Sequence, residues 1–134
     1  MSTNVTLDKL SRQFPRSVIE THNYRGDATA IVRKEEILAI CTFLRDDPEL
    51  AYNFMMDLTA VDYMGKTPRF EVVYHLYSLS KNQRVRIKAQ VSEADCAIDS
   101  IVSIWIAADW FEREVFDLYG IVFKGHPNLK RILL

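Results

Sequence analysis

Three strand-like segments follow one another in the middle of the sequence, and the short turns between them limit the folds that the chain can adopt. The segments are residues 54–63, 69–78 and 84–91. In the last two, apolar side chains recur at every second position, which is the period of a strand with one buried face. The first segment is apolar on both sides, which predicts a central strand. Connections of hairpin length join antiparallel neighbours, so we expect a largely antiparallel sheet.

Helices and a hairpin surround these strands in the sequence. The pattern predicts a short helix that ends at Pro15, a hairpin over residues 17–32 and an amphipathic helix over residues 34–46. Another short helix is expected over residues 98–104. We therefore expect residues 1–134 to form a single two-layer α+β domain. A mixed, mostly antiparallel five-stranded sheet would carry helices mainly on one face, in the order α-β-β-α-β-β-β-α.

The clearest helix pattern spans residues 110–119, with Asp109 as its expected N-cap. Glu112, three residues later, completes a capping box, and Gly120 supplies a left-handed stop. The helix is apolar on more than one side, and carboxylates stand between its aromatic residues. This suits a helix packed between its own sheet and another subunit, with charges paired across the contact. An acid pair in an active site is the alternative interpretation of the same residues.

The charge balance limits the classes of partner. The chain has 17 Lys and Arg residues against 18 Asp and Glu residues, a formal net charge of −1. Nucleic-acid binders normally carry a basic excess, so we expect no nucleic-acid partner. The start of the chain lacks the features of a signal peptide, and no apolar run approaches the roughly 20 residues that span a bilayer. We expect a cytoplasmic protein that reaches a membrane only through a partner.

Residues typical of metal or cofactor sites are scarce. The four glycines are spread along the chain and form no phosphate-binding loop. Cys41 and Cys96 form neither a zinc nor an iron–sulfur site, and we expect reduced thiols rather than a disulfide. His22, His75 and His126 lie in separate segments. The sequence therefore predicts no catalytic residue, metal site or cofactor in this chain.

Arg84, Arg86 and Lys88 form a basic row on one side of the third strand segment. Side chains on one face of a strand repeat at every second residue, so neighbours in the row are about 7 Å apart. The row fits a solvated face that protects the strand from aggregation. It also fits a surface that docks to an acidic partner.

The C-terminal part carries a longer motif. Its residues are Glu112-Arg113-Glu114, Asp117-Leu118-Tyr119-Gly120-Ile121, Phe123, Gly125-His126-Pro127, Leu129 and Arg131-Ile132-Leu133. This spacing resembles the signature of the 30-kDa subunit family of respiratory complex I, which in bacteria is the C-type subunit of NADH-quinone oxidoreductase. The resemblance extends upstream to about residue 50. Ile106 and Asp109 depart from it, since the family usually has proline and asparagine there. Family members also generally continue past this chain's end into a tail that wraps a neighbouring subunit.

The resemblance implies a structural role in a redox complex. Such a complex passes electrons from NADH through FMN and iron–sulfur clusters to a quinone, and translocates protons. The subunit lies in the hydrophilic arm, at the cytoplasmic face of the bacterial inner membrane, against the 49-kDa-type subunit. FMN, the clusters and the quinone belong to partner subunits.

Ten residues are expected at the subunit interface. They are Glu112, Arg113, Glu114, Asp117, Tyr119, His126, Arg131, Arg84, Arg86 and Lys88. Residues 121–134 are expected to form an extended partner-binding tail.

Two alternatives keep part of this interpretation. A homologous subunit of a membrane-bound hydrogenase, or of another complex I-like dehydrogenase, has the same fold, because this domain does not touch the electron donor. A small stand-alone acid–base enzyme would instead need a pocket that contains Glu114 or Asp117 with a raised pKa.

Overall fold

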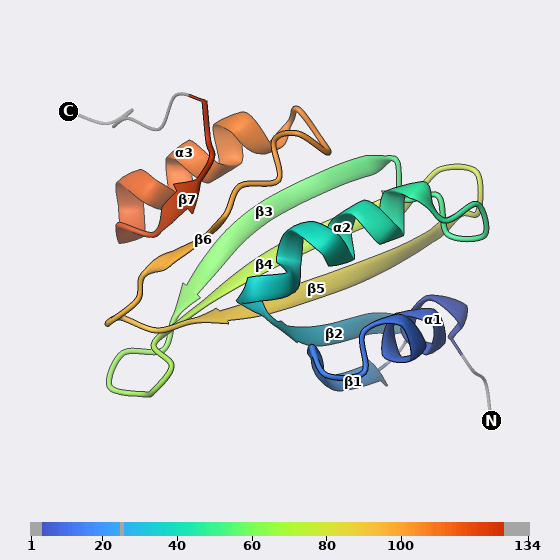
Figure 1. The fold of residues 1–134 in the computed structure, drawn as a ribbon, viewed down its shortest axis with the longest axis horizontal. Helices are drawn as coiled ribbons and strands as arrows, with labels where there is room; N and C mark the ends of the chain where they lie inside the picture. Colours follow the sequence, from blue (N-terminus) through green and yellow to red (C-terminus); the bar gives the residue numbers. More distant parts are fainter. Residues whose placement is uncertain (1–3, 25, 128–134) are drawn as a thin grey trace.

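A computed structural model describes residues 4–24 and 26–127 of the chain. Its helices pack against one large sheet, and two short strands form a separate pair (Figure 1). In chain order they are α1 (Val5–Gln13), β1 (Val18–Tyr24), β2 (Asp27–Arg33), the 3-10 turn η1 (Lys34–Glu36), α2 (Ile37–Asp46), β3 (Phe54–Asp62), β4 (Phe70–Ser78), β5 (Gln83–Val91), β6 (Ala97–Asp99), α3 (Ala108–Tyr119) and β7 (Val122–Lys124).

The large sheet has the strand order β1-β2-β5-β4-β3 (Figure 1). β2 and β5 pair in parallel, whereas the other neighbouring pairs are antiparallel. After β2 the chain passes through α2 to the far edge at β3, and it returns by two hairpin connections that place β5 beside β2. β6 and β7 form a separate parallel pair. The predicted mixed, mostly antiparallel five-stranded sheet is confirmed.

Side-chain alternation places the core on one face of this sheet. The core residues of β5 are Val85, Ile87, Ala89 and Val91. The basic residues between them point to the opposite face, as predicted. α2 covers the core with the predicted stripe of Ile37, Ile40, Cys41 and Leu44, each 0% exposed.

The three helices pack on the same face of the sheet. α2 lies over β4 and β5 in Figure 1, α1 packs against β1 and β2, and α3 packs against β3. The ring of Tyr119 on α3 contacts the ring of Phe70, a core residue, with 6.2 Å between the ring centroids. No described helix covers the opposite face, which we call the bare face. The predicted two-layer arrangement is confirmed.

β3 is an edge strand, so the prediction of a central strand over residues 54–63 is wrong. α3 packs against its core side, while the apolar side chains of Phe54, Met56 and Val61 are exposed. Leu58 and Ala60 belong to the core. Asp62 at its end pairs with Arg69, with 2.8 Å between Oδ1 and Nε. Exposed apolar side chains on an edge strand thus make its sequence resemble that of a central strand.

The segment between β5 and α3 contains β6 instead of the helix that was expected over residues 98–104. Ile98 lies opposite Phe123 of β7, and both side chains are in the core. The Ile101 N–H donates to the Glu112 carboxylate rather than to a helical carbonyl. Tertiary contacts therefore decide the conformation of this segment.

α3 begins at Ala108, and its N-cap makes no side-chain hydrogen bond. The predicted cap at Asp109 is wrong, because Asp109 already lies inside the helix. Glu112 does not complete a capping box either, since its carboxylate binds groups after β6. The stop at Gly120 is confirmed: its φ of 75° lies in the left-handed region, which favours glycine.

Candidate subunit interface

Glu112 is enclosed within its own chain and is 0% exposed. Oε1 accepts a hydrogen bond from the Ser100 hydroxyl at 2.6 Å, and Oε2 accepts one from the Ile101 N–H at 2.9 Å. Burial raises the pKa of the Glu112 carboxyl, and these two hydrogen bonds oppose the shift. Glu112 thereby ties α3 to the segment after β6. This position does not agree with the expected contact of Glu112 with a partner.

His126 has a similar role further along the motif. Its side chain is 0% exposed, and Nε2 lies 3.1 Å from Oδ1 of Asp109. Nε2 lies equally close to the main-chain oxygen of Asp109, and that oxygen takes part in the hydrogen bond. His126 therefore holds the Gly-His-Pro turn against the first turn of α3. This position does not agree with the expected reach of His126 toward a partner.

α3 also has an outer face, which we define as Trp110, Glu114 and Leu118. Positions four residues apart lie on the same side of a helix. Trp110 is 52% exposed and Leu118 is 58% exposed, and Glu114 between them is exposed. Ile106, just before the helix, is 84% exposed. The helix therefore presents large apolar side chains outward while its inner side is buried in the core.

Arg113, Asp117 and Tyr119 are partly buried. Nε of Arg113 is enclosed and has no hydrogen-bond partner among the described residues. Leaving a buried donor unpaired costs about 1–3 kcal/mol, so such groups are rare in native proteins. Tyr119 packs against Phe70, as described above. Arg131 lies outside the described residues.

The basic row lies on the bare face. Arg84 is exposed, whereas Arg86 and Lys88 are partly buried. Nζ of Lys88 is 3.8 Å from a carboxylate oxygen of Glu71 on β4. Neither arginine forms an ion pair within the described part of the chain. Among the described residues, one cation of the row thus forms an ion pair and two do not.

Residues 121–134, the expected tail, are in part built into the domain. Residues Val122–Lys124 form β7, and the side chains of Ile121 and Phe123 are buried. Residues 128–134 lie outside the described residues. The expectation of a partner-binding tail therefore concerns a segment that the structure does not describe.

Sequence reasoning did not identify the exposed apolar residues Ile106, Trp110 and Leu118 as interface candidates. A signal was available, because Trp110, Glu114 and Leu118 recur at intervals of four residues. The surroundings of the basic row, including His75 and Asp27, were also missed, because they come from other strands. Such a grouping depends on strand register, which the motif does not contain.

Within residues 4–24 and 26–127, no group of three or more His, Cys, Asp or Glu side chains is placed to hold a metal ion. Cys41 and Cys96 are free thiols, as predicted. None of the helices in this part of the chain is long and apolar enough to cross a membrane.

A helix that is buried on one side and apolar on the other is typical of a subunit in a larger assembly. Comparison with known families agrees with this class. Residues 30–134 match the family described as "Respiratory-chain NADH dehydrogenase, 30 Kd subunit". The chain belongs to this family, as the resemblance of its C-terminal motif predicts. Its predicted role as a subunit of a respiratory oxidoreductase complex is thereby confirmed.

Individual relatives and solved structures agree. The chain is 50% identical over 131 residues to the C-type subunit of NADH-quinone oxidoreductase from Geotalea uraniireducens (strain Rf4), covering 98% of this chain and 79% of that protein. The solved structure of a trypsin-resistant fragment (1-134) of Nqo5 is 26% identical, with a TM-score of 0.80, covering 93% of this chain and 100% of that one. A chain of the membrane-bound sulfane sulfur reductase, an archaeal respiratory membrane complex, is 21% identical, with a TM-score of 0.78 and coverage of 96% and 74%. At that identity the likeness shows the fold alone.

Proposed function

We propose that this chain is a structural subunit in the hydrophilic arm of a proton-translocating NADH-quinone oxidoreductase, at the cytoplasmic face of the bacterial inner membrane. In such a complex, electrons pass from NADH through FMN and iron–sulfur clusters to a quinone. We assign these cofactors to partner subunits. The outer face of α3 is the proposed contact with the 49-kDa-type subunit.

One observation carries this contact: α3 is buried on its inner side and apolar on its outer face. Trp110 and Leu118 are each about half exposed. Fully burying a large apolar side chain contributes about 1.5–3 kcal/mol, so covering the exposed half of each contributes part of that amount. Tryptophan is also among the residues that most often dominate binding at protein interfaces. The outer face therefore has the composition of the centre of an interface.

The charges around the outer face indicate what the partner offers. Arg113 has an enclosed Nε without a hydrogen-bond partner among the described residues. A docked partner does not reach this enclosed nitrogen, whereas a partner carboxylate or carbonyl would still complement the positive charge of Arg113. Glu114 lies between the two apolar residues, so the same partner surface needs a basic or hydrogen-bonding group opposite it. The partner surface should thus combine an apolar pocket with one acceptor and one donor.

Glu112 and His126 support this contact from inside the chain. Glu112 holds α3 to the segment after β6, and His126 holds the Gly-His-Pro turn to the start of α3. A helix fixed in this way loses little conformational freedom on binding, which favours affinity. The motif residues therefore contribute to assembly by positioning the outer face.

A matched pair of leucine substitutions tests the proposed contact. Leu118 on the outer face is 58% exposed, and Leu79 in the turn between β4 and β5 is 64% exposed. Each is changed to Asp in the tagged chain, and the complex is purified from membranes of the source organism. The 49-kDa-type subunit retained on the tagged chain is quantified by mass spectrometry.

Leu118→Asp should reduce the retained 49-kDa-type subunit by roughly tenfold or more, because it places an unpaired charge in a desolvated contact. Leu79→Asp should retain it. Equal retention by both variants would show that the outer face of α3 is not the contact.

The alternatives receive less support from the geometry. For a stand-alone acid–base enzyme, Glu112 is unsuitable because both its oxygens are bound inside the chain, and Glu114 stands on an exposed helix face. A subunit of a hydrogenase or another complex I-like dehydrogenase shares the fold. The same purification distinguishes these cases, because the co-purified subunits identify the electron donor.

A further inference from the structure

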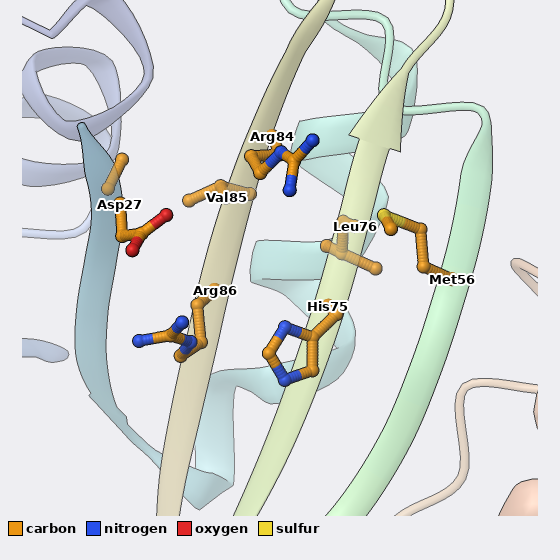
Figure 2. Close-up of a pocket in the computed structure, with 8 residues that line it drawn as sticks. Asp27, Met56, His75, Leu76, Arg84, Val85 and Arg86 are labelled. Atoms are coloured by element: carbon orange, nitrogen blue, oxygen red, sulfur yellow. The ribbon is translucent and has the colours of Figure 1, made fainter. Parts of the chain in front are cut away.

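The bare face of the sheet is not used by the contact proposed above. On this face β4 and β5 place His75 opposite Arg86 and Tyr77 opposite Arg84. β2 lies on the other side of β5, with Thr29 opposite Arg86. Figure 2 shows the two arginines and His75 in front of the strands, with α2 behind them. This face and the outer face of α3 therefore belong to opposite sides of the two-layer domain.

A small hollow opens on the bare face, with about 60 Å³ of free space. Asp27, Met56, His75, Arg84 and Arg86 stand around it (Figure 2). The hollow is open to solvent, and a small group such as a single carboxylate fits into it. The hollow is therefore suited to one small polar group from a larger molecule.

Two arginines that form no ion pair in the described part of the chain stand around the hollow. Neither Arg84 nor Arg86 pairs with an acid among the described residues, whereas Lys88 on the same strand lies 3.8 Å from Glu71. Burial lowers the pKa of His75, the nearby Arg86 lowers it further, and Asp57 opposes the shift. A carboxylate placed over the hollow would accept charge-assisted hydrogen bonds from a guanidinium group at its rim.

We propose that this hollow receives the carboxylate of an Asp or Glu side chain from a second protein subunit, distinct from the partner of the α3 outer face. The basic row is then a docking surface, with Arg84 and Arg86 as its binding residues. This inference does not depend on the contact of α3 with the 49-kDa-type subunit.

The pattern of charges on the bare face favours a folded protein over a polyanion. Asp27 stands at the hollow itself, and Asp57 lies opposite His75 on β3. A row of phosphates would meet these carboxylates and be repelled, whereas a protein surface can place one acid and avoid the others. Met56 beside the hollow is 43% exposed and Phe54 is 48% exposed. These apolar side chains add the area that a protein contact needs around its charged centre.

The experiment uses an Arg86→Lys variant in the assembled complex, purified from membranes of the source organism. The complex is treated with a water-soluble carbodiimide, which joins an amine to a carboxylate in direct contact as an amide and itself takes up the water to become a urea. Cross-linked peptides are then identified by mass spectrometry. An Arg86→Gln complex, which lacks the amine, is the matched control.

The expected product is an amide between position 86 and an Asp or Glu of another subunit, absent from the Arg86→Gln complex. Phosphate groups give no such amide, so the product identifies a protein carboxylate as the occupant. Amides only to Asp27 or Asp57 of the same chain, or no amide at position 86, would overturn the proposal. A Leu118→Asp variant that assembles normally would overturn the α3 contact and leave this result standing.

A charge reversal gives a second measurement. The double variant Arg84→Glu/Arg86→Glu should weaken binding of the acidic partner by roughly 30-fold or more, because like charges then meet at the contact. Arg12→Glu, an exposed position on α1, is the matched control and should bind normally. The thermal midpoint of the isolated double variant should fall only modestly, since neither arginine forms an ion pair in the described part of the chain, although the new carboxylates lie near Asp27 and Asp57. Normal binding by the double variant would also overturn the proposal.

Discussion

Glu112 and Glu114 stand two residues apart on α3, and their environments are opposite. Glu112 on the inner side is 0% exposed and binds two groups of its own chain. Glu114 on the outer face is exposed between two exposed apolar residues. The Glu-Arg-Glu motif therefore combines one residue that holds the fold with another that is available to a partner. A conspicuous motif on a helix need not serve a single purpose.

The largest effect should separate the two glutamates directly. Glu112→Ala should lower the free energy of unfolding of the isolated chain by about 3 kcal/mol, because it leaves the Ile101 N–H unpaired and opens a cavity. Glu114→Ala should change it by less than about 0.5 kcal/mol, as is usual for an exposed position. Urea denaturation of both variants measures the difference. Equal values would remove the distinction between the inner and outer faces.

The next effect concerns the outer face. A substitution there should weaken assembly more than it lowers the stability of the isolated chain. Trp110→Ala should weaken assembly with the partner by about 2 kcal/mol, because tryptophans at interface centres commonly contribute this much. Its effect on the stability of the isolated chain should be well below that of Glu112→Ala, since the side chain is 52% exposed. Titration of the purified partner and urea denaturation provide the two readouts. A loss of stability without a loss of assembly would show that Trp110 supports the fold rather than the contact with the partner.

A smaller effect is expected at the C-terminal end of α3. Gly120 stops α3 at a φ of 75°, and a Cβ there would meet no atom within 4 Å. Gly120→Ala should therefore cost about 1 kcal/mol from backbone strain alone. Gly120→Asn should cost less, because asparagine tolerates this conformation better than alanine does. Thermal denaturation of the pair checks this order, and the reverse order would argue against strain as the cause.

The smallest effect is a pH dependence. Burial raises the pKa of Glu112 above its ordinary value of 4.5. At pH values between the ordinary pKa and the raised pKa, the folded chain holds more protons than the unfolded chain. The contribution of Glu112 to stability therefore falls as the pH rises through this window. Glu112→Gln retains hydrogen-bonding groups but cannot ionise. The difference in stability between the native chain and this variant should therefore shift in favour of the native chain as the pH is lowered through the window, measured by urea denaturation at several pH values. A difference that is independent of pH would show that Glu112 does not titrate in this range.

Much of the fold could be predicted from local pattern. The alternation of residues 84–91 and the stripe of α2 each report burial on one face, and both are found in the structure. The conformation of residues 98–104 could not be predicted this way, because Glu112 takes the Ile101 N–H that a helix would use. The position of β3 at the edge was also missed. Composition does not distinguish buried apolar side chains from those that an edge strand exposes, such as Phe54 and Met56.

The candidate interface was only partly predictable for a similar reason. Family resemblance identified the motif, and the motif does not say which of its side chains point inward. Glu112 and His126 turn out to be internal, whereas Glu114 is exposed on the outer face. Whether the remaining residues contact a partner stays a prediction. The grouping of Arg84, Arg86 and His75 required the register between β4 and β5.

The parallel pair of β2 and β5 has a consequence for the order of folding. β3, β4 and β5 follow one another through short connections, so their pairing closes only small loops. The hairpin of β1 and β2 joins the sheet only through β5, which is made much later in the chain. During synthesis from the N-terminus, this hairpin must therefore wait with an unpaired edge until β5 emerges from the ribosome. We expect it to be the last part of the sheet to dock and the first to exchange its amide hydrogens.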